Sequence, residues 1–312
     1  MSETRCGFVA LIGAPNAGKS TLLNALVGSK VSIVSRKAQT TRNAVRGILV
    51  EGAAQIIFVD TPGLFAPKRR LDRAMVASAW GAAGEADALA FLIDARQELA
   101  ALGKPDAPNA ELSEQTKAIL ATLAESRAPK FLVLNKIDLV ERPRLLALAE
   151  RLNAALTFDE TFMISASTGD GVGRLSARLA EAMPAGPWLY PEDQIADAPM
   201  RSLAAEITRE KLFERLHDEL PYQTTVETES WKDLPDGSAR IEQTIYVTRE
   251  SHKKIVIGEG GRTIKSIGAA ARKDIAEANE TPVHLFLFVK VRENWLDDPE
   301  RYRAMGLDFP KG

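Results

Sequence analysis

One short stretch of this 312-residue chain combines glycine, lysine and serine at a spacing suited to binding phosphate. Residues 13–20 read GAPNAGKS, which fits the pattern G-x-x-x-x-G-K-[ST] between an apolar run and a helical stretch. In such a loop the backbone N–H groups surround the phosphates, the lysine reaches the β and γ oxygens, and the final hydroxyl binds Mg²⁺. The ligand-binding residues predicted here are Gly13, Ala14, Pro15, Asn16, Ala17, Gly18, Lys19, Ser20 and Thr21.

A second motif indicates which base accompanies the phosphates. NKID at 135–138 follows the apolar run FLVL, so it lies at the carboxyl end of a strand, where open α/β folds bind ligands. A carboxylate at Asp138 can accept hydrogens from the N1–H and the amine of guanine, whereas adenine offers no such pair. We expect Asn135 to brace the pocket and the stem of Lys136 to cover the base. In SAS at 165–167, Ser165 and the N–H of Ala166 would complete the guanine site.

A third motif, DTPG at 60–63, follows the apolar run IIFV. Asp60 is placed to hold Mg²⁺ through water, and the N–H of Gly63 to sense the γ-phosphate of a nucleotide. Thr41 in QTTR is the expected third metal contact, with Thr40 as the alternative. The residues expected to act in catalysis are Lys19, Thr41 and Gly63.

Leu64 follows DTPG directly, at a position where some GTP-hydrolysing proteins carry a glutamine that orients water. Leucine cannot form that hydrogen bond. Turnover should therefore be slow and should depend on the loop, Mg²⁺, backbone groups or a partner.

The elements that must position these residues follow a regular order. Apolar runs alternate with helical stretches from about residue 7 to 180, which predicts a mainly parallel sheet with helices on both faces. We assign residues 1–183 to this α/β domain. Residues 184–200 hold four prolines and read as a linker. The order αββααβ over 201–292 predicts an α+β domain, followed by a tail over 293–312.

The second domain carries another glycine turn, IGEGG at 257–261. It lacks the GK[ST] ending and has an acid, Glu259, where a phosphate would be repelled, so a second nucleotide site is not expected. Two helices joined by a GXXG turn instead match a KH module, which clamps about four nucleotides of single-stranded nucleic acid. The residues expected to contact RNA are Lys253, Lys254, Ile257, Gly258, Glu259, Gly260, Gly261, Arg262 and Lys265.

Five motifs in this order resemble the GTPase domain of translation-factor-like GTPases: GAPNAGKS, QTTR, DTPG, NKID and SAS. SRKAQTTR at 35–42, DTPGL and the C-terminal half together resemble the bacterial Era GTPases over nearly the whole chain. The resemblance implies an α/β P-loop GTPase domain and a type II KH domain, GTP/GDP and Mg²⁺ as cofactors, and slow hydrolysis. It also implies binding of small-subunit (16S) rRNA near its 3′ end, a role in assembly of the small ribosomal subunit, and a peripheral contact with the membrane.

Composition and charge bound the alternatives. The net charge is −2, but residues 249–292 hold nine basic against five acidic side chains, so a polyanion partner belongs to the C-terminal part. A single cysteine, Cys6, and an N-terminal apolar run too short for a signal peptide favour a cytoplasmic protein, which we expect to be a monomer.

The rival interpretation is a membrane-recruited signalling GTPase whose second domain binds protein or lipid headgroups. A third, an RNA-binding protein with an inactive nucleotide site, would leave Lys19, Ser20, Asp60 and Asp138 without a role.

Overall fold

The computed structural model describes residues 3–103 and 111–310. The chain divides into two compact units. The first contains the residues up to Val31, Thr41–Asp197 and the residues from Gly306 on, and the second contains Ser32–Thr40 and Ala198–Met305. Each unit is described by itself below.

The first unit is built on a six-stranded sheet in the order β2-β3-β1-β4-β5-β6. Every neighbouring pair is parallel except β2 and β3, which are antiparallel. The mainly parallel sheet expected from the sequence is therefore confirmed, with β2 as an additional strand that the apolar pattern did not reveal. The strands are β1 (Arg5–Gly13), β2 (Val45–Glu51), β3 (Ala54–Asp60), β4 (Ala88–Asp94), β5 (Lys130–Asn135) and β6 (Glu160–Met163).

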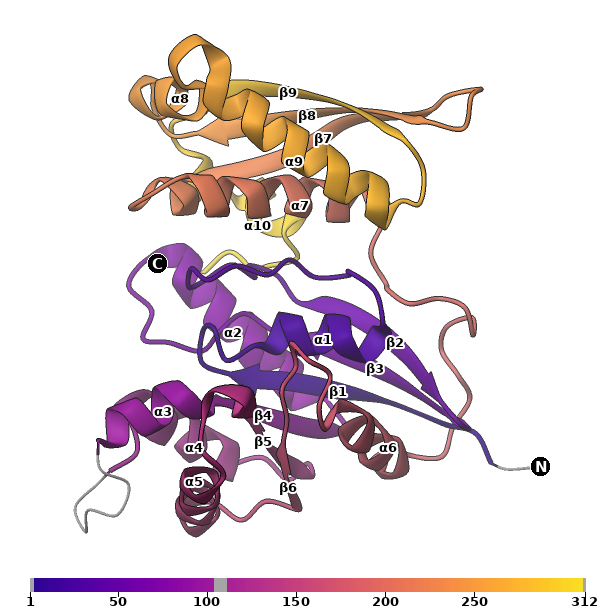
Figure 1. Ribbon diagram of the computed structural model, residues 1–312, viewed down its shortest axis with the longest axis vertical. Coiled ribbons are helices and arrows are strands. Elements are labelled where there is room, and N and C mark those ends of the chain that lie inside the picture. Colours follow the sequence, from indigo (N-terminus) through magenta and orange to yellow (C-terminus); the bar gives the residue numbers. More distant parts are fainter. Residues whose placement is uncertain (1–2, 104–110, 311–312) are drawn as a thin grey trace. The chain divides into compact units, whose positions relative to one another are not determined.

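Helices cover both faces of this sheet (Figure 1). Side chains of α1 and α6 pack on one face, and those of α2, α3, α4 and α5 pack on the other. The inner strands are almost entirely buried, as expected for parallel strands covered on both sides. The helices are α1 (Lys19–Val27), α2 (Arg70–Glu85), α3 (Ala95–Leu102), α4 (Glu114–Ala124), α5 (Arg142–Ala155) and α6 (Val172–Ala182).

The proline-rich stretch after α6 lies along β2 and β3 up to Asp197. Trp188 donates its indole N–H to the carbonyl of Ala53, and Gln55 donates to the carbonyl of Tyr190. Further along, the N–H of Ile48 donates to the carbonyl of Ile195. These hydrogen bonds hold the stretch against the edge of the sheet within the first unit.

The second unit has a three-stranded sheet in the order β7-β8-β9, with β7 antiparallel and β9 parallel to β8. Apolar side chains of α7, α8 and α9 pack on one face of it. The order αββααβ expected from the sequence is confirmed. The elements are α7 (Met200–Arg215), β7 (Thr224–Asp233), β8 (Ala239–Val247), α8 (Glu250–Ile257), α9 (Arg262–Ala278), β9 (Val283–Val291) and the short α10 (Pro299–Ala304).

Residues 32–40, which the sequence placed inside the first domain, pack within the second unit. Ile33 is buried in the same apolar cluster as Ala204 and Ile207 of α7. The N–H of Val34 donates to Glu210 at 2.7 Å. The Lys37 ammonium donates to the carbonyl of Phe213 at 2.5 Å. This segment therefore belongs structurally to α7, although Thr41 directly after it belongs to the first unit.

The helices of both units are at most 17 residues long. Within the two described ranges, none of them has the length and apolar character needed to cross a bilayer.

Candidate nucleotide-binding site and candidate nucleic-acid interface

The phosphate-binding loop connects β1 to α1, and its two glycines are sterically required. A Cβ added to Gly13 would lie 2.4 Å from the carbonyl oxygen of Leu92. Gly18 has φ +97°, and a Cβ there would lie 2.2 Å from the amide nitrogen of Asn135. Because glycine alone accepts both the close approach and the left-handed backbone, these positions fix the path of the loop.

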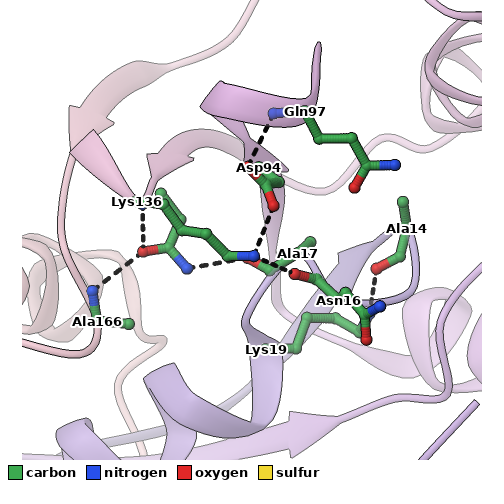
Figure 2. Close-up of polar contacts among 9 residues, drawn as sticks. Ala14, Asn16, Ala17, Lys19, Asp94, Gln97, Lys136 and Ala166 are labelled. Atoms are coloured by element: carbon green, nitrogen blue, oxygen red, sulfur yellow. Dashed lines mark hydrogen bonds and ion pairs between the residues drawn. The ribbon is translucent and has the colours of Figure 1, made fainter. Parts of the chain in front are cut away.

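Lys19 is buried at the start of α1, and its ammonium donates to the carbonyls of Gly13 and Ala14, each at 3.0 Å. Figure 2 shows the contact with Ala14. Burial lowers the pKa of Lys19 to about 8, although the nearby Asp60 carboxylate opposes that shift. An ammonium has three N–H donors, so the loop's carbonyls use two of them. A phosphate oxygen at the loop is the natural acceptor for the third.

Three oxygen-bearing side chains meet beside Lys19. The Ser20 hydroxyl donates to the Asp60 carboxylate at 2.6 Å and lies 3.0 Å from the Thr41 hydroxyl. Hydroxyl and carboxylate oxygens are the ligands that Mg²⁺ takes, usually with substrate phosphates and water completing the coordination. The three residues thus fit the metal expected with a nucleotide. The Thr40 hydroxyl instead donates to the Lys37 carbonyl at 2.8 Å within the second unit, which favours Thr41 over Thr40.

The DTPG loop lies against the phosphate-binding loop. A Cβ on Gly63 would come within 2.7 Å of the backbone of Pro15. The N–H of Leu64 donates to the Gly13 carbonyl at 3.0 Å, and its carbonyl accepts a 2.6 Å hydrogen bond from Gln115 of α4. The Leu64 side chain is 3% exposed and packs in the core. Leu64 is therefore a packing residue, and no sequence motif indicated that Gln115 holds its backbone.

Asn135 ties three loops together at the end of β5. Its amide N–H₂ donates to the Ala17 carbonyl at 2.9 Å. Its oxygen accepts from the N–H of Ala166 at 3.0 Å and from that of Lys136 at 2.8 Å. The bracing role expected of Asn135 fits these contacts. The Ala166 N–H, expected to serve the guanine oxygen, donates to Asn135 here, because the loop after β6 folds against this amide.

The remaining expected site residues follow β5 and β6 or lie at the start of α1. Asp138 is exposed in a short 3₁₀ helix, Ile137–Leu139, that begins directly after Lys136. Ser165 is buried, with its hydroxyl 3.2 Å from that of Ser167. Thr21, in the first turn of α1, is half-buried. The structure therefore gathers the expected phosphate, metal and base residues at the carboxyl edge of one sheet.

The second glycine turn joins α8 to α9. Gly258 has φ +73°, and a Cβ there would lie 2.2 Å from the Thr263 hydroxyl. Gly260 and Gly261 also have left-handed φ, but a Cβ on Gly260 would meet no atom within 4 Å. Gly258 is therefore required because a side chain there would clash with Thr263. Gly260 is favoured by its backbone conformation alone.

Charged residues surround this turn on the surface. Glu259 and Arg262 form an ion pair, although their side chains are 87% and 77% exposed. Lys254 and Lys265 are exposed on α8 and α9, while Lys253 and Ile257 are half-buried. Glu259, which the sequence analysis expected to repel a phosphate, is thus paired with the basic side chain of Arg262. The turn presents its backbone and a basic rim to solvent.

The fold and the site define a P-loop GTPase with a second, KH-type domain. Comparison with known proteins agrees: the family described as "50S ribosome-binding GTPase" matches residues 8–136, and the KH domain family matches residues 219–296.

Two curated relatives identify the family. GTPase Era of Afipia carboxidovorans is 65% identical over 308 residues, covering 99% of this chain and 96% of that protein. GTPase Era of Brucella suis is 62% identical over 309 residues, covering 99% and 95%. The chain belongs to the Era family of GTPases, as its resemblance indicated.

Solved structures of Era proteins share the fold over nearly the whole chain. One, in complex with MgGDPNP and nucleotides 1506–1542 of 16S ribosomal RNA, is 36% identical with a TM-score of 0.87, covering 97% of this chain and 99% of that chain. An Aquifex aeolicus Era variant bound to GDP·AlF₄⁻ is 37% identical with a TM-score of 0.86 and the same coverage.

Proposed function

We propose that this protein is a GTP-hydrolysing switch that binds the 3′ end of small-subunit rRNA through its KH domain and assists assembly of the small ribosomal subunit. The observation that carries the first part is the meeting of Ser20, Thr41 and Asp60 beside the buried Lys19, on the sheet edge that also bears Asn135. The proposal for RNA rests on the family and on the Era protein solved with 16S rRNA.

Base selection is assigned to Asp138, whose carboxylate accepts two hydrogens from guanine. Adenine offers no such pair of donors, so it would leave the carboxylate without them, and an unpaired polar group in the site disfavours the wrong base. The stem of Lys136 covers the base, and Asn135 holds the pocket walls through the backbones of Ala17 and Ala166.

Phosphate binding is assigned to the loop from Gly13 to Thr21. Its N–H groups and the start of α1 attract the phosphate oxygens, and Lys19 adds a charge-assisted donor. Ser20, Thr41 and Asp60 would hold Mg²⁺, which when bound neutralises charge on the phosphate oxygens as the terminal phosphate is displaced.

Hydrolysis proceeds without a side-chain amide after DTPG, because residue 64 is leucine. Its side chain is buried in the core. The protein's own contribution is electrostatic: Lys19 and the N–H of Gly63 face charge that grows on the γ-phosphate. Gly63 suits this role because its lack of a side chain lets its backbone lie against Pro15. Slow turnover follows, since no side chain of the loop orients water.

RNA binding is assigned to the turn Gly258–Gly261 and to the basic residues on its flanks. Backbone N–H groups of the turn and the ammonium groups of Lys254 and Lys265 would face phosphates. We place the protein in the cytoplasm, where both GTP and ribosomal precursors are found, with peripheral membrane contact as a further proposal implied by the family resemblance.

Two measurements test the function. Asp138→Asn should shift binding from guanosine to xanthosine nucleotides, because the amide can donate to the oxygen that replaces the guanine amine. A gel shift with RNA from the 3′ end of 16S rRNA, in parallel with flotation of liposomes, separates the RNA role from the rival lipid role. Unchanged GTP preference in the variant would contradict the base site, and binding to liposomes without RNA binding would contradict the RNA role.

A further inference from the structure

Asp94, the last residue of β4, contacts the expected guanine site from outside the recognised motifs. One carboxylate oxygen accepts a 2.5 Å hydrogen bond from the Lys136 ammonium. The same ammonium donates to the Asn16 carbonyl of the phosphate-binding loop at 2.8 Å. Figure 2 shows the lysine extended between these two acceptors. These contacts join the end of β4 to two loops, the one after β1 and the one after β5.

We propose that Asp94 is a positioning residue of the guanine site, which holds the Lys136 ammonium so that the lysine stem lies over the base. The inference rests on the proposed assignment of Asn135, Lys136 and Asp138 to that site.

The strand register explains why Asp94 lies there. β4 and β5 are parallel neighbours, and Asp94 is paired in register with Asn135. The carboxyl ends of the two strands therefore bring position 94 next to the start of NKID. An acid in the last position of β4 is within reach of the lysine that follows Asn135, and the observed hydrogen bond is the result.

Lysine needs such a partner to be useful as a wall of the pocket. Its four-carbon stem loses rotamer entropy when it is fixed. A single hydrogen bond to the Asn16 carbonyl would offset only part of this cost. The Asp94 carboxylate adds a charge-assisted bond, which is stronger than a neutral one. The two side chains are 13% and 31% exposed, so water weakens the pair less than it would at the surface.

Asp94 also caps helix α3. An effect of replacing Asp94 could therefore come from the lost cap, and the experiment must distinguish this from the positioning of Lys136. Its other carboxylate oxygen accepts from the N–H of Gln97 at 3.0 Å, at the N-terminus of α3. Asparagine caps helices about as well as aspartate does. Capping alone therefore predicts little effect of Asp94→Asn, whereas positioning of the lysine requires the charge.

The experiment measures the rate at which the full-length protein releases a fluorescent GDP analogue. Asp94→Asn should speed release by about tenfold, in line with loss of one charge-assisted hydrogen bond. In a Lys136→Ala background the same substitution should change the rate by less than about twofold, because Asp94 acts through the lysine. The matched control is Asp298→Asn, which alters an aspartate that caps α10 of the second unit and should leave GDP release unchanged.

The outcomes separate this inference from the base-site assignment. If Lys136→Ala releases GDP at the parent rate, the assignment of the base site is wrong. If Lys136→Ala speeds release but Asp94→Asn does not, only the role of Asp94 is overturned. An equal acceleration by Asp94→Asn with and without Lys136 would show that Asp94 acts through the fold, and would also overturn the proposal.

Discussion

The two glycine turns of this protein hold their shape by different means. Around Gly18, side chains from other loops fix the backbone, and Asn135 alone contributes hydrogen bonds to three loops. Around Gly260, the turn is held by its own two helices, and no atom lies within 4 Å of the space that a side chain would enter. Tertiary contacts thus define the first turn, and local backbone conformation defines the second.

This difference matters for what each turn can bind. A site fixed by surrounding loops is organised before its ligand arrives, which reduces the cost of ordering on binding. The nucleotide site has that character, with Lys19, Asp60 and Asn135 all buried. The second turn presents exposed backbone and charge, which suits a flexible strand that adapts to the protein.

The sharpest test of the comparison is the same substitution in both turns. Gly18→Ala forces a Cβ against Asn135 in a strained backbone, so loss of the Asn135 hydrogen bonds and the strain together should weaken GTP binding by about a thousandfold. Gly260→Ala introduces only a left-handed alanine, at a cost of about 1–2 kcal/mol, and should weaken RNA binding by about thirtyfold or less.

Calorimetry with GTP and filter binding with 16S 3′-end RNA would check the two values. Equal losses at the two positions would mean that the turns do not differ in the way described.

A second prediction concerns Leu64, which connects the nucleotide loop to the core. Leu64→Ala should destabilise the protein by about 3 kcal/mol, because a buried leucine is lost. GTP hydrolysis per folded molecule should change by less than about tenfold, since the side chain points away from the phosphates. Chemical denaturation and turnover assays measure these effects. Leu146→Ala, at a leucine that is 63% exposed, is the control and should cost about 0.5 kcal/mol or less.

Much of this organisation could be predicted from the sequence, because the motifs lie at strand ends and the strands are apolar. β2 was missed because its side chains are only partly buried and show no clear alternation. The packing of residues 32–40 with α7 could not be predicted, since Ile33 finds its partners more than 170 residues away. Gln115 and Asp94 were missed because they belong to no motif. For Asp94 a signal existed: a carboxylate that ends a parallel strand beside NKID.

A third prediction uses the burial of Lys19, which has no counterpart in the exposed turn. Its pKa is about 8 in the structure described, and bound phosphate should raise it. GDP affinity should therefore have its full value below pH 8, where Lys19 is protonated. It should fall as the pH rises above 8, by about tenfold at pH 9. Fluorescence titration at pH 7, 8 and 9 measures the profile. Lys19→Met should bind more weakly with a flat profile, and a profile that slopes as in the parent would assign the effect to another group.

The smallest expected effect tests the exposed turn itself. Glu259 pairs with Arg262, so Glu259→Gln should release the guanidinium for an RNA phosphate, and Glu259→Lys should add a further cation. The slope of log affinity against log salt should steepen by about 0.7 for each additional phosphate that the protein neutralises on a single strand.

Glu277→Lys, near the far end of α9, adds the same charge away from the turn and controls for net charge. Gly260→Asp should act in the opposite direction, since a second acid would then lie beside the phosphates. Filter binding over a range of salt concentrations distinguishes these cases. If Glu259→Lys and Glu277→Lys change affinity and slope equally, only overall charge attracts the RNA, and the turn is a connection between two helices.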